Sequence, residues 1–79
     1  MVEGQANLRL TDLPPGAQGT IVRVKIGKLV NSRLVSLGFT PGVQVQMMRN
    51  YGYGPLIVIV RGTQVALGRG EASKIEVQK

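Results

Sequence analysis

Leu56 to Val60 is the longest apolar run in this 79-residue chain, and glycine or proline stands close to it on both sides. The run is far shorter than the ~20 residues that a helix needs to cross a bilayer. A short apolar run bounded by turn residues fits the most buried strand of a small sheet. Val and Ile together number 16 against 8 Leu, and β-branched side chains favour strands. We therefore expect a mainly β protein with one domain.

Most other apolar residues alternate with polar ones, as in strands that are buried on one face. In the stretch from Ile21 to Ile26, this alternation predicts that Val22, Val24 and Ile26 share one face, with Arg23 and Lys25 on the other. Further strands are expected at 8–10, 43–48, 56–60, 64–67 and 74–77, with a hairpin loop at 51–55, a tight turn at 61–63 and one helical turn at 71–73.

Residues 29–37 fit a short helix better than a strand. Val30, Leu34 and Leu37 stand at i, i+4 and i+7, so they share one helix face. A shorter helix with Asn31 as its N-cap is the alternative start. Gly38 is suited to the left-handed position that ends a helix, and Phe39 would then pack back on Leu34. Thr40-Pro41-Gly42 turns the chain away.

These elements predict a small SH3-like barrel of five to six short strands, with one short helix between strands 2 and 3. Closure is expected because an open sheet of such strands would expose two edges. The alternative small barrel, an OB-fold, would need longer strands and usually a helix between the third and fourth. We expect residues 1–6 to be a flexible N-terminus and residues 7–78 to form the single domain.

The composition argues against an enzyme and against a metal or cofactor site. The chain has no Cys and no His, so it lacks the commonest nucleophile, general base and transition-metal ligands. Its four Asp and Glu are scattered, and its two G-x-G segments are not followed by the third glycine and long helix of a dinucleotide site. The N-terminus does not resemble a signal peptide, so we expect a soluble, intracellular protein.

The chain carries a net charge of +6, with ten Lys and Arg against four Asp and Glu. The basic residues are dispersed, and three aromatic residues provide few platforms for stacking on bases. Three interpretations therefore stay open: a solvated basic surface, a patch that contacts a protein or a membrane surface, and a nucleic-acid-binding surface.

The candidate contact residues lie in the 51–55 loop and on the helix. Tyr51 and Tyr53 are either exposed interface anchors or a pair that crosses the hairpin and covers the barrel mouth. Arg33 lies off the apolar helix face, where it contacts a partner or covers apolar surface with its stem.

The order of short motifs along the chain resembles the ferrous iron transport protein A (FeoA) family over residues 7–78. The most specific block is Arg33-Leu34-x-x-Leu37-Gly38-Phe39-x-Pro41-Gly42. It stands among weaker motifs in the family's order: Leu13-x-x-Gly16-x-x-Gly19-x-Ile21 before it, and Gly54-Pro55, Val60-Arg61-Gly62, Ala66-Leu67 and Glu71-Ala72-x-x-Ile75-x-Val77 after it. Many relatives carry Ala-Pro-x-Gly-Asp-Pro in the hairpin, whereas this chain has Asn50-Tyr51-Gly52-Tyr53-Gly54-Pro55, without the acidic residue. We also expect Gly68-Arg69-Gly70 to be looser than in relatives.

The resemblance implies an SH3-like barrel in the bacterial cytoplasm, at the inner face of the membrane through its partner. That partner would be ferrous iron transport protein B, a permease with a cytosolic GTP-binding domain, and the chain would be a non-enzymatic accessory of Fe²⁺ uptake that carries no iron itself. We expect the block Arg33, Leu34, Leu37, Gly38, Phe39, Pro41 and Gly42 to be structural. We expect the partner to be bound by Arg49, Tyr51, Tyr53, Arg61 and Arg33.

Two other functions compete with this hypothesis. One is an SH3-like module that binds nucleic acid through its basic surface, with binding that falls steeply as salt rises. The other is self-association through an open strand edge.

Overall fold

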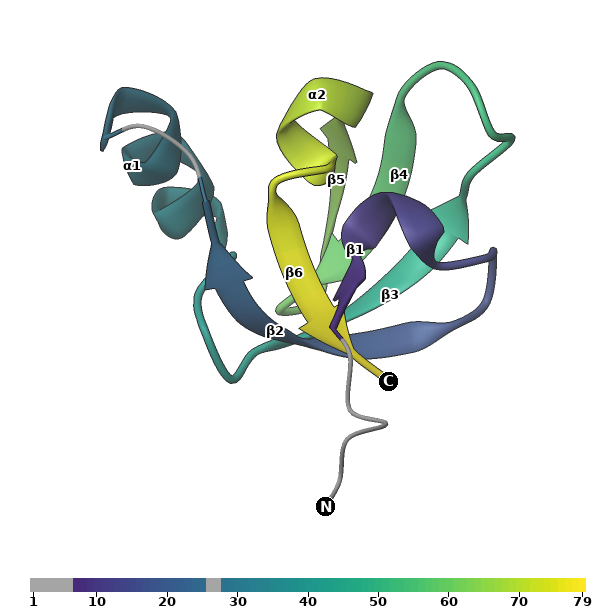
Figure 1. The fold of residues 1–79 in the computed structure, drawn as a ribbon, viewed down its shortest axis with the longest axis horizontal. Helices are drawn as coiled ribbons and strands as arrows, with labels where there is room; N and C mark the ends of the chain where they lie inside the picture. Colours follow the sequence, from purple (N-terminus) through teal and green to yellow (C-terminus); the bar gives the residue numbers. More distant parts are fainter. Residues whose placement is uncertain (1–6, 26–27) are drawn as a thin grey trace.

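The computed structural model describes residues 7–25 and 28–79, which form a six-stranded, strongly bent sheet with one helix at its side (Figure 1). Its elements are, in order, β1 (Leu8–Arg9), the 3₁₀ turn η1 (Leu10–Asp12), β2 (Gln18–Val24), α1 (Lys28–Leu37), β3 (Gln44–Arg49), β4 (Leu56–Val60), β5 (Thr63–Leu67), α2 (Arg69–Ala72) and β6 (Ile75–Gln78). The prediction of a mainly β chain with one short helix between strands 2 and 3 is confirmed. The flexible terminus predicted at 1–6 lies outside the described residues.

The strands follow the order β1-β6-β2-β3-β4-β5, and every neighbouring pair is antiparallel. β2 is the strand that bends the sheet around the core, because its first half pairs with β3 and its second half with β6. Figure 1 shows β2 sweeping beneath the other strands. Among the described residues, β1 and β5 are left as the two edges of the sheet, so the closure that was expected to remove both edges is incomplete.

One apolar core fills the inside of the bent sheet. β4 alternates strictly, with Leu56, Val58 and Val60 fully buried and the outward Ile57 and Ile59 half-buried. The core draws on every strand except β1, which only packs against it. Its members are Leu10, Leu13, Ile21, Leu34, Phe39, Val45, Met47, Leu56, Val58, Val60, Val65, Leu67, Ala72, Ile75 and Val77. No buried side-chain nitrogen or oxygen among the described residues lacks a hydrogen-bond partner.

A β-bulge in β2 makes part of the predicted face pattern wrong. Ile21 pairs with Val77 and Arg23 pairs with Glu76, so Val22 is an extra residue between the two pairs. The side of the strand that faces the core therefore changes at Val22: Ile21 is buried, whereas Val22 is only half-buried. The inward and outward alternation of side chains shifts by one residue across a bulge, so a prediction that counts every second residue fails beyond it. The predicted strand end at Ile26 lies outside the described residues.

The first predicted strand is also shorter than expected. Only Leu8 and Arg9 pair with β6, and Leu10 begins a 3₁₀ turn that buries it fully. The Asp12 carboxylate accepts a hydrogen bond from the Arg9 backbone N–H (3.0 Å), so a side chain satisfies this backbone donor at the start of the turn. The predicted helical turn at 71–73 is α2, which begins two residues earlier, at Arg69.

The helix α1 ends as its sequence predicts. The Phe39 N–H donates to the Leu34 carbonyl (2.9 Å) and the Gly38 N–H to that of Val35 (3.0 Å), the pair of bonds that defines a Schellman motif. Gly38 has a φ of +105°, and Leu34 and Phe39 are both fully buried. The helix begins at Lys28, one residue before the predicted start, so the Asn31-capped alternative is wrong. The Val30 side chain lies outside the described side chains.

The tight turn between β4 and β5 lies against the end of α1. Val60 and Thr63 pair across it, and both central residues have positive φ, +52° at Arg61 and +79° at Gly62, as in a type I′ turn. A Cβ placed on Gly38 would lie 2.7 Å from the Arg61 Cδ. The aliphatic stem of Arg61 therefore occupies the space that a side chain at residue 38 would need.

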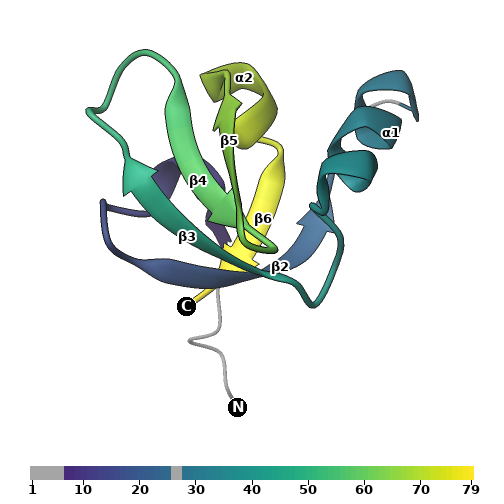
Figure 2. The same cartoon turned by 180° about the vertical axis from the view of Figure 1, so that it is seen from behind.

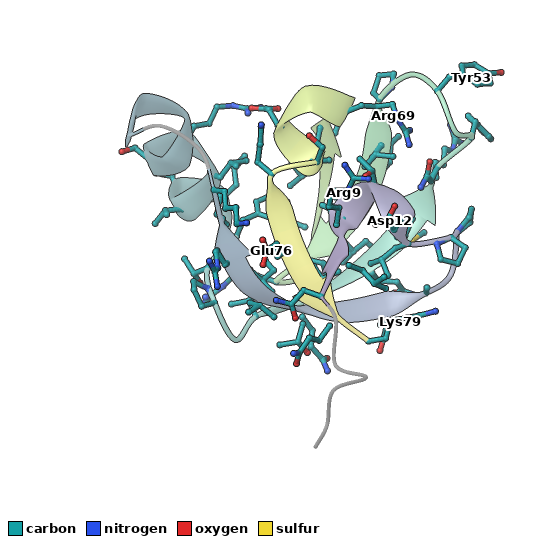
Figure 3. The ribbon with its side chains drawn as sticks, viewed as in Figure 1. Arg9, Asp12, Tyr53, Arg69, Glu76 and Lys79 are labelled. Atoms are coloured by element: carbon teal, nitrogen blue, oxygen red, sulfur yellow. The ribbon has the colours of Figure 1, made fainter. Side chains whose placement is uncertain are left out.

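Glu76 joins three strands on the outer face of the sheet (labelled in Figure 3). Its carboxylate accepts from Lys25 Nζ (2.6 Å) and Asn7 Nδ2 (3.1 Å), and Arg23 Nε lies 3.7 Å away. The hydrogen bond from Lys25 lowers the pKa of Glu76 most, followed by the bond from Asn7, and the positive charges of Lys25 and Arg23 lower it further.

We expect Gly38→Ala to destabilise the protein by about 1–3 kcal/mol, because the substitution puts a side chain at positive φ and against Arg61. Gly42→Ala is the matched control: Gly42 also has positive φ (+91°), but a Cβ there meets no atom within 4 Å. Urea unfolding should show the larger loss for Gly38→Ala, and adding Arg61→Ala should bring that loss close to the Gly42→Ala value. Equal losses in the two single variants would contradict the close approach of Arg61.

The lowered pKa of Glu76 predicts a contribution to stability that depends on pH. A carboxyl with a lower pKa in the folded state stabilises the protein above its unfolded pKa, and this stabilisation is lost as pH falls through the folded pKa. Urea unfolding at several pH values from about 6 to about 3 should show a steeper loss for the wild type than for Glu76→Gln. Lys25→Ala should reduce the difference. Parallel curves for the wild type and Glu76→Gln would contradict the assignment.

Candidate partner-binding site

The loop between β3 and β4 exposes two aromatic rings. Tyr51 and Tyr53 are 65% and 74% exposed, the highest values for large hydrophobic residues in the described part of the chain. Their ring centroids are 6.3 Å apart, with the ring planes tilted by 36°. Figure 3 shows Tyr53 pointing away from the barrel. The rings therefore do not cover the barrel mouth, and the interpretation as exposed anchors agrees with the geometry.

A hollow of about 330 Å³ adjoins the two rings, and we call it the tyrosine pocket. Ile57 of β4 and Ala66 of β5, which pair with each other, contribute from the outer face of the sheet. The full lining is Arg49, Tyr51, Tyr53, Gly54, Pro55, Ile57 and Ala66. An apolar hollow flanked by exposed aromatic rings and one charged group has the composition of a protein-binding site.

A second bulge brings Arg49 to this pocket. Met47 pairs with the buried Val58, whereas Arg49 pairs with the outward Ile57, so Met48 is the extra residue of β3. In a regular strand, Met47 and Arg49 would point to the same face, because side chains repeat every second residue. The bulge instead leaves Met47 in the core and turns Arg49 to the outer face, next to the tyrosines.

Asn50 connects the base of the loop to other parts of the chain. Its Nδ2 donates to the carbonyl oxygens of Thr11 (3.0 Å) and Leu13 (2.9 Å). Its Oδ1 accepts from the Gly52 N–H (3.1 Å) and from Nη1 of Arg69 (3.1 Å). All four hydrogen-bonding positions of the amide are thus used, and the loop is connected to η1 and α2.

Arg69 supports the loop from α2, a role that the sequence analysis missed. Its Nη1 also lies 3.4 Å from the Gly54 carbonyl oxygen, and Figure 3 shows the side chain lying beneath the loop. Gly68-Arg69-Gly70, which we expected to be looser than in relatives, contains the start of α2: Gly68 is its N-cap residue and Arg69 its first residue. No sequence signal connects an arginine between two glycines to a loop fifteen residues earlier.

The structure does not bring Arg33 or Arg61 to the tyrosine pocket. Arg33 of α1 forms an ion pair with Glu71 of α2, and α1 lies on the opposite side of the barrel from the loop (Figure 2). Arg61 follows Val60 at the end of β4 away from the loop, and the five residue steps from Leu56 to Arg61 correspond to roughly 16 Å at about 3.3 Å per residue. Of the five predicted contact residues, Arg49, Tyr51 and Tyr53 are therefore the ones that cluster.

The block from Arg33 to Gly42 contains the residues that end α1 and turn the chain towards β3. Leu34, Gly38 and Phe39 are buried and Leu37 is half-buried, whereas Pro41 and Gly42 are exposed in the turn. The Gly42 N–H donates to the Ile21 carbonyl oxygen (2.8 Å), which fastens this turn to β2. These contacts agree with the structural role expected for the block.

A larger hollow, of about 430 Å³, lies between α1 and β2 and is lined by Val22, Arg23, Val24, Val35, Phe39 and Pro41. It is a weaker candidate for binding a partner than the tyrosine pocket, because its one aromatic residue, Phe39, is fully buried and its one charged residue, Arg23, already lies near Glu76.

Within residues 7–25 and 28–79, no group of three or more Asp, Glu, His or Cys could hold a metal ion. Nor does this part of the chain contain a helix long and apolar enough to cross a membrane.

Comparison with known families gives a match over nearly the whole chain. The model of the FeoA domain matches residues 8–79. A relative from Methanocaldococcus jannaschii, provisionally named Fe(2+) transport protein A, is 35% identical over 63 residues, which cover 80% of this chain and 76% of the relative.

Solved structures extend the match to the fold. The crystal structure of an iron uptake regulatory protein, FeoA, superimposes with a TM-score of 0.86 at 33% identity, covering 92% of this chain and 97% of that one. FeoA from Stenotrophomonas maltophilia, a zinc complex described as a prokaryotic SH3 domain protein, gives a TM-score of 0.79 at 31% identity, covering 89% and 88%. A manganese-dependent transcriptional repressor shares the fold alone, with a TM-score of 0.86 at 20% identity, over 100% of this chain and 45% of its own. The SH3-like architecture is thus confirmed.

We expect Asn50→Ala to loosen the tyrosine loop, because it removes both carbonyl contacts and the acceptor for Gly52 and Arg69. The loss of stability should be about 1–3 kcal/mol, since the carbonyls are left without their donor. Amide hydrogen exchange should quicken at residues 51–54 more than in β6. Asn50→Asp keeps the acceptor but not the donor, so it should retain more of the loop's protection. Unchanged exchange in both variants would contradict this role of Asn50.

Proposed function

Because the chain belongs to the FeoA domain family, we propose that it is a cytoplasmic accessory protein of ferrous iron uptake that binds a membrane permease directly. The permease is of the ferrous iron transport protein B type, with a cytosolic GTP-binding domain. FeoA proteins are ferrous iron transport accessory proteins and not enzymes. The finer proposal, a direct contact at the inner face of the membrane, needs a surface suited to binding a protein.

The tyrosine pocket is the observation that supports this proposal. Tyr and Arg are among the residue types that contribute most to protein–protein binding energy, and the pocket presents two exposed tyrosines beside Arg49. The Asn50 contacts hold the base of the loop, so less conformational entropy is lost on binding than with a free loop. The permease would therefore contact the side of the barrel opposite α1.

Arg33 and Arg61 have a smaller part in this proposal than the sequence indicated. The ion pair with Glu71 and the packing against Gly38 give each of them a role within the fold. We accordingly assign the contact to Arg49, Tyr51 and Tyr53.

We expect Tyr51→Ala and Tyr53→Ala together to weaken binding to the permease by roughly 30-fold or more, as loss of two anchor residues does. The measurement is an NMR titration of the isotope-labelled protein, at physiological salt, with the cognate permease in nanodiscs and with its isolated GTP-binding domain. Val35→Ala is the matched control, because Val35 is an exposed apolar residue (46%) on α1, away from the loop.

Saturable shifts at residues 49–57 that disappear in the double tyrosine variant would support the proposal. An affinity that the double variant leaves unchanged would contradict the loop assignment. No binding to the intact permease would contradict the proposed function itself. In that case RNA is the next ligand to titrate, and affinity that falls steeply with salt would identify a nucleic-acid-binding module.

A further inference from the structure

The tyrosine pocket combines an apolar lining with a single charged group. Ile57, Ala66 and Pro55 are apolar, the two rings add aromatic surface, and Arg49 is the only charged residue that lines it. Its volume of about 330 Å³ suits one or two side chains of a partner, being at the lower limit of sites for small molecules.

The charge beside this pocket is not neutralised within the described residues. In residues 7–25 and 28–79, each side-chain carboxylate is paired elsewhere: Asp12 with Arg9, Glu71 with Arg33, and Glu76 with Arg23 and Lys25. No carboxylate in these ranges pairs with Arg49, or with Arg69, whose Nη1 donates to the uncharged Asn50 amide and lies near the Gly54 carbonyl. Two guanidinium groups therefore give the loop and its pocket a positive potential.

This charge decides between the candidate occupants. A wholly apolar segment would remove water from Arg49 without replacing it by a counter-charge, which is costly. A second copy of this chain would bring the same arginines to a two-fold interface, and each copy has a net charge of +6. A segment with carboxylates next to its apolar side chain satisfies both the charge and the lining.

We propose that the tyrosine pocket binds an acidic segment of a partner protein, with one apolar or aromatic side chain held beside Tyr51 and Tyr53 and a flanking carboxylate paired with Arg49. This inference deepens the proposed function and rests on it, since it names the chemistry of the partner segment at the same site.

The test uses two capped peptides of equal length, Ac-Glu-Asp-Leu-Phe-Glu-NH₂ and its uncharged counterpart Ac-Gln-Asn-Leu-Phe-Gln-NH₂. Each is titrated into the isotope-labelled protein at physiological salt and followed by NMR. The acidic peptide should bind roughly tenfold more tightly, with shifts at the Arg49 side chain, Ile57 and Ala66. Arg49→Gln should reduce this preference to about threefold or less. Arg61→Gln is the matched control and should preserve it, since Arg61 is exposed at the opposite end of β4.

In the peptide titration, the inference would be overturned by equal affinity for the two peptides, by shifts away from the pocket, or by a preference for the acidic peptide that survives Arg49→Gln. Shifts at the pocket that depend on protein concentration without peptide would identify a second copy as the occupant and overturn it as well. Tighter binding of an oligouridylate than of the acidic peptide at the pocket would also overturn the inference, because it would identify a nucleic acid as the occupant. Permease binding that needs the tyrosines but is unaffected by Arg49→Gln would leave the proposed function standing and remove this inference alone.

Discussion

The sheet of this protein has to bend sharply around one small core, and most other features of the structure follow from that constraint. Six strands of two to seven residues enclose the core only because β2 pairs with β6 along one half and with β3 along the other. Bulges allow a strand to bend, and they also reverse which side chains face inward. The bulges at Val22 and Met48 therefore both curve the sheet and turn Arg23 and Arg49 to the outer face.

Arg23 and Arg49 make different contacts because different residues surround them. Arg23 lies near Glu76, where it adds to a charged cluster that connects β1, β2 and β6. Arg49 instead meets the half-buried Ile57 and the tyrosine loop, with no carboxylate paired to it in the part of the chain that the structure describes. The same backbone irregularity thus supports the fold at one end of the sheet and forms the candidate binding site at the other. Asn50 completes that site through hydrogen bonds to carbonyls of residues 11 and 13.

Local signals predicted the regular parts of the molecule well. The strand 56–60, the helix up to Leu37 and the stop at Gly38 and Phe39 each depend on neighbouring residues, through alternation, helical spacing and the need for positive φ. The site could be predicted only in part. Tyr51 and Tyr53 stand out as aromatic residues among glycines, but the contacts of Asn50 with residues 11, 13 and 69 join segments far apart in sequence. The 3₁₀ turn after β1 was missed for a related reason, since Leu10 is buried by the distant core.

The sequence by itself determined the class of fold, the positions of most strands and the end of the helix, because each of these depends on the period and conformational preference of nearby residues. It also determined the family, through motifs whose order spans the chain. Only the tertiary structure decided which basic residues share a surface. That outcome depends on two bulges, on the side of the barrel where α1 lies, and on ion pairs such as Arg33 with Glu71, all of which arise from closing the sheet around its core.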